Sequence, residues 1–341
     1  MKRAPAVMQV ALLFVCAGVA AGAELSDCLP DLPVALTVRI GAAAPVHALL
    51  RGGDAPALQV IDAQSGAPLW SAGAAAPVTQ RFAAMSAPFA GSLIALDTDG
   101  DGLDDRLYAG DLAGRLWRFD LHNGAPAGTW ASGGVFADFS NDAGRMFLAP
   151  PDVALMSPPG AAPWFSIALG TAAPGRADAD NRFYVLRDTT PFASWSDAQY
   201  HDWQPLHESD LARVAGTSAA ADGGSGPGWF VALGGGDVLG AALTASGRTV
   251  FAIADSLTGC RSAFSLATLD LAQRRLVSDA SGAWRAAVAG ELPLGTSFAL
   301  IADTGGVPAG TARCQFGDVH VADCDVDLRP HRTWWRREDA E

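Results

Sequence analysis

Residues 105–124 read DRLYAGDLAGRLWRFDLHNG, with two runs of alternating polar and apolar residues on either side of a short turn. Alternation with a period of two is the pattern of β-strands, and the glycines, aspartates and asparagine that bound the runs are turn residues. Residues 57–73, ALQVIDAQSGAPLWSAG, follow the same plan, so that IDAQSGAPLW lines up with AGDLAGRLW. Each copy predicts a strand ending near aspartate, a tight turn, and a second strand ending near tryptophan.

Further short runs of this kind recur at residues 181–188, 248–255 and 265–277. Helical periodicity is hard to find beyond the first 23 residues, so the chain is predicted to be all-β. A turn-punctuated unit at a spacing of about 40 to 50 residues favours a modified β-propeller, with about seven blades or fewer for a chain of this length. A β-sandwich with coincidental turns is the alternative.

The stretches between these runs are rich in loop-forming residues, at 125–145, 171–180, 189–226 and 303–313. We interpret them as insertions between blades rather than as domain linkers. The sequence therefore predicts one domain over residues 24–341. The aromatic residues predicted to fill its core are Trp117, Phe119, Trp164, Trp229 and Phe230.

The first 23 residues have the layout of a secretory signal peptide. Lys2 and Arg3 precede an apolar segment at residues 7–20, and small residues at 21–23 form an A-x-A pattern. A membrane-spanning helix is the alternative, but it needs about 20 apolar residues and usually lacks the small-residue exit. We expect cleavage after Ala23, export, and no membrane insertion of the mature chain.

The chain is acidic, with 36 Asp and Glu residues against 23 Lys and Arg residues and a formal net charge of −13. A surface of this charge argues against nucleic acid or an anionic membrane as a partner, and it favours cations. Metal cations are therefore the first ligands to consider.

Four cysteines remain after Cys16 is removed with the signal peptide, and an even number in an exported chain favours disulfides. Cys314 and Cys324 flank QFGDVHVAD, a segment that can fold back as a hairpin, which predicts a bond between them. Cys28 and Cys260 form the other predicted pair. Four free or partly buried thiols are the alternative, and no cysteine has the spacing of a zinc ligand.

Residues 97–105 read DTDGDGLDD and contain five aspartates directly after the apolar run GSLIAL. Like charges this close repel one another, so either the segment is a solvated acidic turn or a cation holds it together. Counted from its first residue, the segment places oxygen ligands at positions 1, 3, 5, 7 and 9 of an EF-hand loop, with glycine at position 6. The candidate ligands are the side chains of Asp97, Asp99, Asp101 and Asp105 and the backbone carbonyl of Leu103.

Two features differ from an EF-hand. Tyr108 stands at position 12 in place of the bidentate glutamate, and the flanking segments are predicted strands rather than helices. Asp105 would therefore supply the closing carboxylate of a shorter loop. A ligand set of oxygens alone suits a hard cation, and it favours Ca²⁺ over Zn²⁺ and Mg²⁺. Asp104 is off the ligand register, and we expect it to bond the turn or to face water.

Residues 85–121, MSAPFAGSLIALDTDGDGLDDRLYAGDLAGRLWRFDL, resemble the calcium-loop blade of the PilC/PilY family of type IV pilus biogenesis and tip proteins. Other segments resemble later blades of the same domain, in the same order, and a short C-terminal ending; they lie at residues 150–156, 164–176, 180–188, 226–243, 248–271 and 332–339. The resemblance implies a modified propeller with Ca²⁺ on the loop residues named above.

The resemblance also implies a function. The chain would be an exported protein of type IV pilus biogenesis, in the periplasm, at the outer-membrane surface or at the pilus tip, with minor pilins or other pilus components as partners. Calcium occupancy would influence the balance of pilus extension and retraction. These proteins often carry an N-terminal von Willebrand A-like domain with a D-x-S-x-S motif, and this sequence has no such motif, so a role in cell adhesion is not implied for it.

Two other functions are weighed against this one. A PQQ-dependent quinoprotein dehydrogenase is the enzyme alternative, because IDAQSGAPLW resembles the tryptophan-docking repeat of PQQ propellers, which also use calcium. That motif is clear only once, however, and the chain has no G-x-S-x-G, no H-E-x-x-H and no glycine-rich phosphate loop before a helix. We therefore expect a protein that is not an enzyme. A periplasmic scaffold unrelated to pili is the third candidate.

Overall fold

The computed structural model describes residues 33–302, 311–321 and 326–327, with short gaps at residues 54, 56, 76, 90, 141–143, 175, 177–178, 215, 218–225, 259, 280 and 295. The predicted signal peptide, Cys28, Cys324 and the ending at 332–339 lie outside the described residues. The described chain is almost entirely β-structure, which confirms the predicted class. Its helical elements are α1 (Asp197–Asp202) and two 3₁₀ turns, η2 (Ala127–Thr129) and η3 (Glu208–Asp210).

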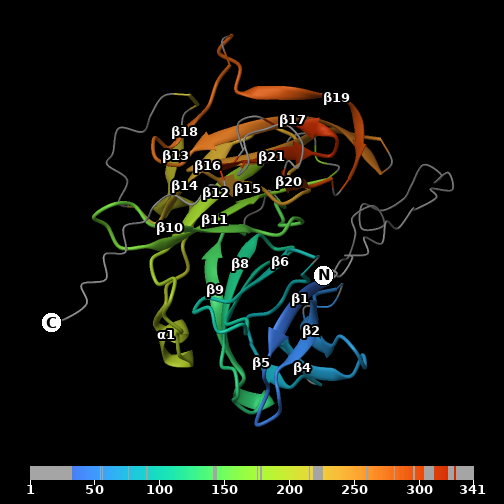
Figure 1. Cartoon of the computed structure of the whole chain (residues 1–341), viewed down its shortest axis with the longest axis vertical. Coiled ribbons are helices and arrows are strands. Elements are labelled where there is room, and N and C mark those ends of the chain that lie inside the picture. Colours follow the sequence, from blue (N-terminus) through green and yellow to red (C-terminus); the bar gives the residue numbers. More distant parts are fainter. Residues whose placement is uncertain are drawn as a thin grey trace, which may run out of the picture.

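The strands form five mainly antiparallel sheets, numbered here in chain order (Figure 1). Sheet 1 has the order β1 (Val34–Val38), β2 (Val46–Arg51), β3 (Ala57–Asp62), β4 (Pro68–Gly73) and β5 (Gln80–Arg81). Sheet 2 has the order β6 (Leu93–Leu96), β7 (Arg106–Gly110), β8 (Arg115–Leu121) and β9 (Ala131–Asp138). Both contain four consecutive antiparallel strands, the pairing typical of a propeller blade.

The later sheets follow a similar plan, and in Figure 1 they form the upper part of the molecule. Sheet 3 has the order β10 (Asp152–Met156), β11 (Trp164–Gly170), β12 (Arg182–Asp188), β14 (Gly228–Ala232) and β13 (Ala212–Val214). Sheet 4 contains β15 (Leu243–Ala245), β16 (Arg248–Thr258), β17 (Arg261–Asp270), β18 (Arg275–Leu276) and β19 (Arg285–Pro293). Sheet 5 contains β20 (Phe298–Ala302), β21 (Thr311–Phe316), β22 (Val319–His320) and β23 (Val326–Asp327).

Successive sheets pack against each other through shared apolar cores, which join sheets 1 and 2, 2 and 3, 3 and 4, and 4 and 5. Of the five aromatic residues predicted as core, four are buried and Trp164 is half-buried against the third core. Burial of large aromatic rings between neighbouring sheets is what makes each sheet depend on the next. Each core contains buried aromatic residues from both of its sheets, in order Trp70 and Trp117, Phe136 and Tyr184, Phe183 and Phe251, and Phe264 and Phe316.

The two repeats that predict the fold form the hairpins β3–β4 and β7–β8. In each, the aspartate closes the turn: Asp62 Oδ1 accepts two backbone N–H groups of its turn at 3.0 and 2.6 Å, and Asp111 Oδ1 accepts two at 3.0 Å. In each, the tryptophan that follows, Trp70 or Trp117, is buried. The shared pattern is therefore a capped turn followed by a core anchor.

Two of the predicted insertions between blades each belong to a single sheet, sheet 2 or sheet 3, so that part of the prediction is wrong. β9 falls within residues 125–145, and α1 and β13 fall within residues 189–226. The glycines of β9 indicate a turn by composition, but Gly133 lies in the sheet opposite Phe119. A Cβ at Gly133 would overlap the Phe119 ring, so glycine is required there for packing rather than for a turn.

The C-terminal hairpin is also present, because β21 and β22 pair with Phe316 opposite Val319. The predicted bonds of Cys314 to Cys324 and of Cys260 to Cys28 involve residues outside the described part, and they stay predictions. The number of blades stays a prediction as well. No described helix is long and apolar enough to cross a membrane.

Candidate metal centre

The acidic segment forms the loop between β6 and β7, two paired strands of sheet 2. The last strand pair before the loop is Leu96 with Arg106, and the Asp105 N–H donates to the Leu96 carbonyl at 2.8 Å. As predicted, the flanks are strands and not helices. The paired strands therefore hold the two ends of the loop together.

Two glycines set the course of the loop. Gly100 and Gly102 have φ values of +82° and +88°, a backbone conformation that favours glycine. Asp97 accepts both of their N–H groups, from Gly100 at Oδ1 (2.7 Å) and from Gly102 at Oδ2 (2.9 Å). The first aspartate of the loop is thus placed by the two turns that the glycines make.

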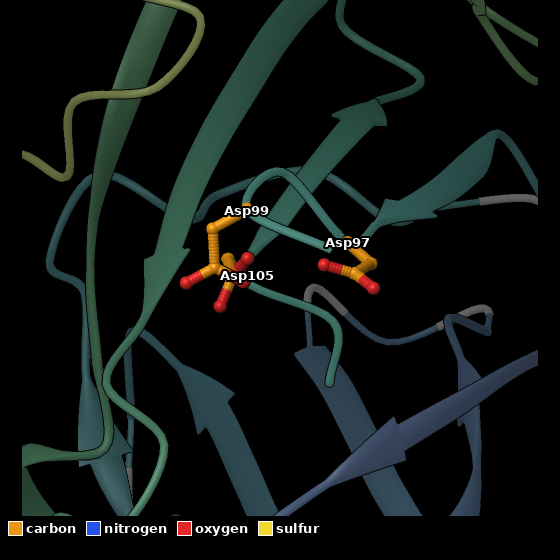
Figure 2. Close-up of side chains that lie close together, drawn as sticks. All are labelled: Asp97, Asp99 and Asp105. Carbon is orange, nitrogen blue, oxygen red and sulfur yellow. The ribbon is translucent and has the colours of Figure 1, made fainter. Parts of the chain in front are cut away.

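Three of the predicted ligands come together. One carboxylate oxygen from each of Asp97, Asp99 and Asp105 lies within 4.8 Å of the other two (Figure 2). Asp97 and Asp99 are exposed, and Asp105 is half-buried and accepts the Thr98 N–H at 2.9 Å. Among the ion pairs of the described residues, none involves these three carboxylates.

The other two predicted ligands are placed differently. Asp101 is exposed in the same loop, outside the group of three, and its Oδ1 accepts the Leu103 N–H at 2.8 Å. Leu103 has a buried side chain, which fixes the middle of the loop to the protein. The structure therefore brings together three of the five residues and keeps the remaining two in the same turn.

Backbone donors and burial act in opposite directions on two carboxyls of this loop. The N–H groups of Gly102 and Gly100 hold the pKa of Asp97 below its ordinary value. Burial raises the pKa of Asp104, and the negative charges of Asp97 and Asp105 raise it further, against the lowering by the Thr37 N–H. Asp97 is thus held in its charged form by the turn, as a cation ligand must be.

The three gathered carboxylates fit a hard divalent cation. Two oxygens on one Ca²⁺ can lie at most about 5 Å apart, because each Ca–O distance is about 2.3 to 2.6 Å. The separation of 4.8 Å or less among the three meets that limit. Oxygen-only donors without histidine or cysteine suit Ca²⁺ better than Zn²⁺.

Asp104 has a structural task that sequence reasoning missed. Its N–H donates to the Thr37 carbonyl at 2.8 Å, and its Oδ2 accepts the Thr37 N–H at 2.7 Å. Thr37 lies on β1, so Asp104 joins the loop to sheet 1. Its position off the ligand register was the one signal in the sequence.

A buried ionic cluster begins at Arg106, at the start of β7. It was not predicted from the sequence. It comprises two arginines and two aspartates, each about 1% exposed or less: Arg106, Arg118, Asp120 and Asp188. β7 and β8 place Arg106 opposite Asp120 and Tyr108 opposite Arg118. Charged residues at alternate positions of an otherwise apolar strand pair are the signal that could have found it.

The cluster joins sheet 2 to the end of β12. Arg106 Nη2 lies 2.7 Å from Asp120 Oδ1, and Arg118 Nη1 lies 2.8 Å from Asp188 Oδ2. Tyr108 donates to the same Asp188 oxygen at 2.5 Å. Burial, followed by the Asp188 charge, raises the pKa of Tyr108 well above its usual value, so it remains a donor. Two positive and two negative charges make this cluster neutral.

Comparison with known proteins gives two likenesses that bear on the fold and the loop. No family model matches the chain. A type IV pilus biogenesis factor PilY1 homolog of Xylella fastidiosa (strain Temecula1 / ATCC 700964) is 56% identical over 36 residues, which are 11% of this chain and 2% of that protein. The crystal structure of the Pseudomonas aeruginosa PilY1 C-terminal domain has a TM-score of 0.56 and 16% identity, covering 86% of this chain and 73% of that one.

A quinohemoprotein alcohol dehydrogenase from Comamonas testosteroni has a TM-score of 0.35 and 11% identity, over 85% of this chain and 44% of that one, and we draw nothing from it. The PilY1 likeness combines a short, strongly identical stretch with a shared fold over most of the chain. The chain is thus similar in fold to the C-terminal domain of PilY1, and the resemblance to the PilC/PilY family of type IV pilus proteins is confirmed.

Proposed function

We propose that the chain is an exported, calcium-binding, propeller-like protein that acts in type IV pilus biogenesis or assembly. One observation carries the proposal: three carboxylates without a positive partner in the described structure gather within 4.8 Å, in a chain with the fold of the PilY1 C-terminal domain. Its partners are minor pilins or other pilus components, in the periplasm, at the outer-membrane surface or at the pilus tip. Calcium occupancy tunes pilus extension against retraction.

The proposed ligand set is unchanged from the sequence. Asp97, Asp99, Asp101 and Asp105 bind through side chains, and Leu103 binds through its carbonyl. When bound, Ca²⁺ supplies the positive charge that this acidic loop lacks. The chain's own residues do the rest: Gly100 and Gly102 turn the backbone, and the paired strands β6 and β7 hold the loop ends in place.

Calorimetric titration of chelator-treated protein with Ca²⁺ tests the site. We expect saturable binding for the wild type, a large loss for Asp97→Ala, and wild-type binding for Asp62→Ala. Asp62 is a matched control, because it also accepts the N–H groups of its own turn but, among the described residues, belongs to no group of candidate metal ligands. Absence of heat at millimolar Ca²⁺, or identical isotherms for wild type and Asp97→Ala, would remove the calcium site from the proposal.

The pilus role is tested in the cell. A deletion strain is complemented with wild type, Asp97→Ala or Asp62→Ala, and surface pili and twitching motility are measured. We expect loss of piliation or twitching in the deletion strain. Asp97→Ala should change the balance of pilus extension and retraction, and Asp62→Ala should restore normal piliation and twitching. Normal piliation and twitching in the deletion strain would favour a periplasmic scaffold unrelated to pili.

The proposal also holds that the protein is not an enzyme. In the repeat that resembles a quinoprotein motif, Trp70 is buried, packs edge-on against Trp130 with centroids 5.2 Å apart, and donates to Gln80 at 3.2 Å. These contacts give Trp70 a task in the core between sheets 1 and 2. Incubation with PQQ and Ca²⁺ tests the alternative: bound quinone together with dye-linked alcohol oxidation would overturn the non-enzyme assignment.

A further inference from the structure

Three consecutive residues at the end of the acidic loop reach three different parts of the molecule. Asp104 bonds to β1 of sheet 1, Asp105 belongs to the carboxylate group, and Arg106 enters the buried cluster that holds the end of β12 in sheet 3. We propose that this triplet couples cation occupancy of the loop to the junctions of sheet 2 with sheets 1 and 3. The inference rests on the proposed calcium site and deepens it, by naming how occupancy would be passed on.

The junction with sheet 1 is built on Asp104 and Asn123. Besides the paired bonds of Asp104 with Thr37, Asn123 Nδ2 donates to the Asp104 carbonyl at 3.0 Å. Asn123 Oδ1 accepts the Arg39 N–H at 2.9 Å, and the Arg39 carbonyl accepts the Gly124 N–H at 2.8 Å. The end of β1 is thus held by hydrogen bonds that depend on where residue 104 lies.

The junction with sheet 3 is built on Arg106. Its guanidinium donates to three backbone carbonyls of the segment that follows β12: Thr190 at 3.1 Å, Pro191 at 3.0 Å and Ala193 at 2.6 Å. It also lies 3.5 Å from Asp188 Oδ2. One side chain therefore fixes the course of a segment more than 80 residues away in the sequence.

Asp105 is the link between the two junctions. Its backbone is bonded on both sides, through its N–H to the Leu96 carbonyl at 2.8 Å and through its carbonyl to the Leu121 N–H at 2.6 Å. Its carboxylate lies close to two others of the same charge, and this repulsion favours opening of the loop. A bound cation reverses the sign of that interaction, so any opening that moves residues 104–106 must first release the ion.

The junction with sheet 3 leads to a segment at the protein surface. Residues 188–203 run from the end of β12 through α1, and Phe192 within them is 58% exposed. Trp195 N–H donates to Asp120 Oδ2 at 3.0 Å, and Asp120 is the carboxylate that Arg106 also binds. A conformational change in the acidic loop would therefore alter the position of residues 188–203, a segment that a partner protein can reach.

Hydrogen exchange of backbone amides, measured by mass spectrometry or NMR with and without Ca²⁺, tests the coupling. Thr37 and Trp195 are the reporters, because their N–H groups donate directly to Asp104 and Asp120. With Ca²⁺ at 100 times Kd we expect their exchange to slow by about tenfold or more, since openings that release the ion become about 100-fold rarer. Amides of β21 in sheet 5 that exchange by local opening serve as the distant control and should not change.

One variant tests the junction of sheet 2 with sheet 1 separately from its junction with sheet 3. Asp104→Ala, compared with wild type at matched Ca²⁺ saturation, should lose the calcium-dependent slowing at Thr37 and keep it at Trp195 and in the loop; Asp62→Ala should behave as wild type. If Ca²⁺ slows exchange in the loop but at neither reporter, or if Asp104→Ala leaves Thr37 unchanged, the coupling is wrong and the calcium site stands. If Ca²⁺ changes no amide, including those of the loop, the calcium site is wrong and the coupling falls with it.

Discussion

The acidic loop and the buried ionic cluster meet at residues 105 and 106, and they deal with concentrated charge in opposite ways. In the loop, carboxylates lie close together at the surface and accept hydrogen bonds from backbone N–H groups of the loop itself. In the cluster, two carboxylates are buried and form ion pairs with two guanidinium groups. The difference lies in the net charge: the loop has a surplus of negative charge, whereas the positive and negative charges of the cluster balance.

The largest effect is expected from breaking the cluster. Asp188 accepts bonds from Tyr108, Arg118 and Thr190, so Asp188→Ala leaves buried guanidinium charge without its partner. We expect a loss of about 3 to 5 kcal/mol in the free energy of unfolding, measured by urea denaturation.

The control for that variant is Asp180→Ala. Asp180 is also paired with an arginine, Arg182, but its side chain is 59% exposed. We expect a loss of about 1 kcal/mol or less there, because an exposed pair is screened by water. Equal losses for the two variants would contradict the view that burial makes the cluster a structural one.

Removal of the cation is the next largest expected effect, and it acts through the loop. With Ca²⁺ at 100 times Kd, chelation should lower the free energy of unfolding by about 2.7 kcal/mol, seen as a lower melting temperature. Asp97→Ala should melt at the same temperature with and without chelator. A wild-type melting temperature that does not respond to chelator would mean that the loop's negative charge needs no ion.

A smaller effect is expected from one neutral donor of the cluster. Tyr200 donates to Asp120 Oδ2 at 2.6 Å, and burial, followed by the Asp120 charge, raises the pKa of this phenol far above its usual value. Tyr200→Phe keeps the ring against Trp195 and removes one bond to a charged group, which should cost about 1.5 to 3 kcal/mol in urea unfolding, towards the lower end because only a neutral donor is lost. Unchanged stability would show that the arginines and the Trp195 N–H satisfy Asp120 without Tyr200.

The smallest effect concerns pH. Asp104 has a pKa raised above its ordinary value of 3.8, so the folded state holds its proton more tightly, and the resulting stability is full below pH 3.8 and lost as pH rises through the raised pKa. Without cation at pH 7, Asp104→Asn should therefore be slightly more stable than wild type, and this advantage should vanish below pH 3.8.

Asp97 should show the opposite sign, because its pKa is lowered. Its contribution is present above pH 3.8 and is lost as pH falls through the lowered pKa, so Asp97→Asn should be less stable than wild type at pH 7 and equal to it in acid. Denaturation midpoints across pH 2 to 7 in chelator measure both variants. The same sign for the two would show that the loop acts on them through one common charge rather than through their separate partners.

Local patterns explain what could be predicted. The hairpins at residues 57–73 and 105–124 were readable because alternation and a capped turn are properties of neighbouring residues. The gathering of Asp97, Asp99 and Asp105 was readable for the same reason, since all three lie in one turn. Strand β9 could not be predicted in this way, because glycine is required at position 133 by the ring of Phe119 on the neighbouring strand.

The sequence by itself determined the all-β class, the repeated strand and turn unit, and the acidic loop with its spacing of carboxylates. These depend on contacts within a few residues, and the chain's periodicity records them directly. Only the tertiary structure decided that Asp104 reaches β1, that Arg106 reaches residues 188–193, and that two arginines and two aspartates are buried together. The pairings that connect one sheet to another join residues 67 to 87 positions apart, and it is the packing of separate sheets, not any local pattern, that selects each partner.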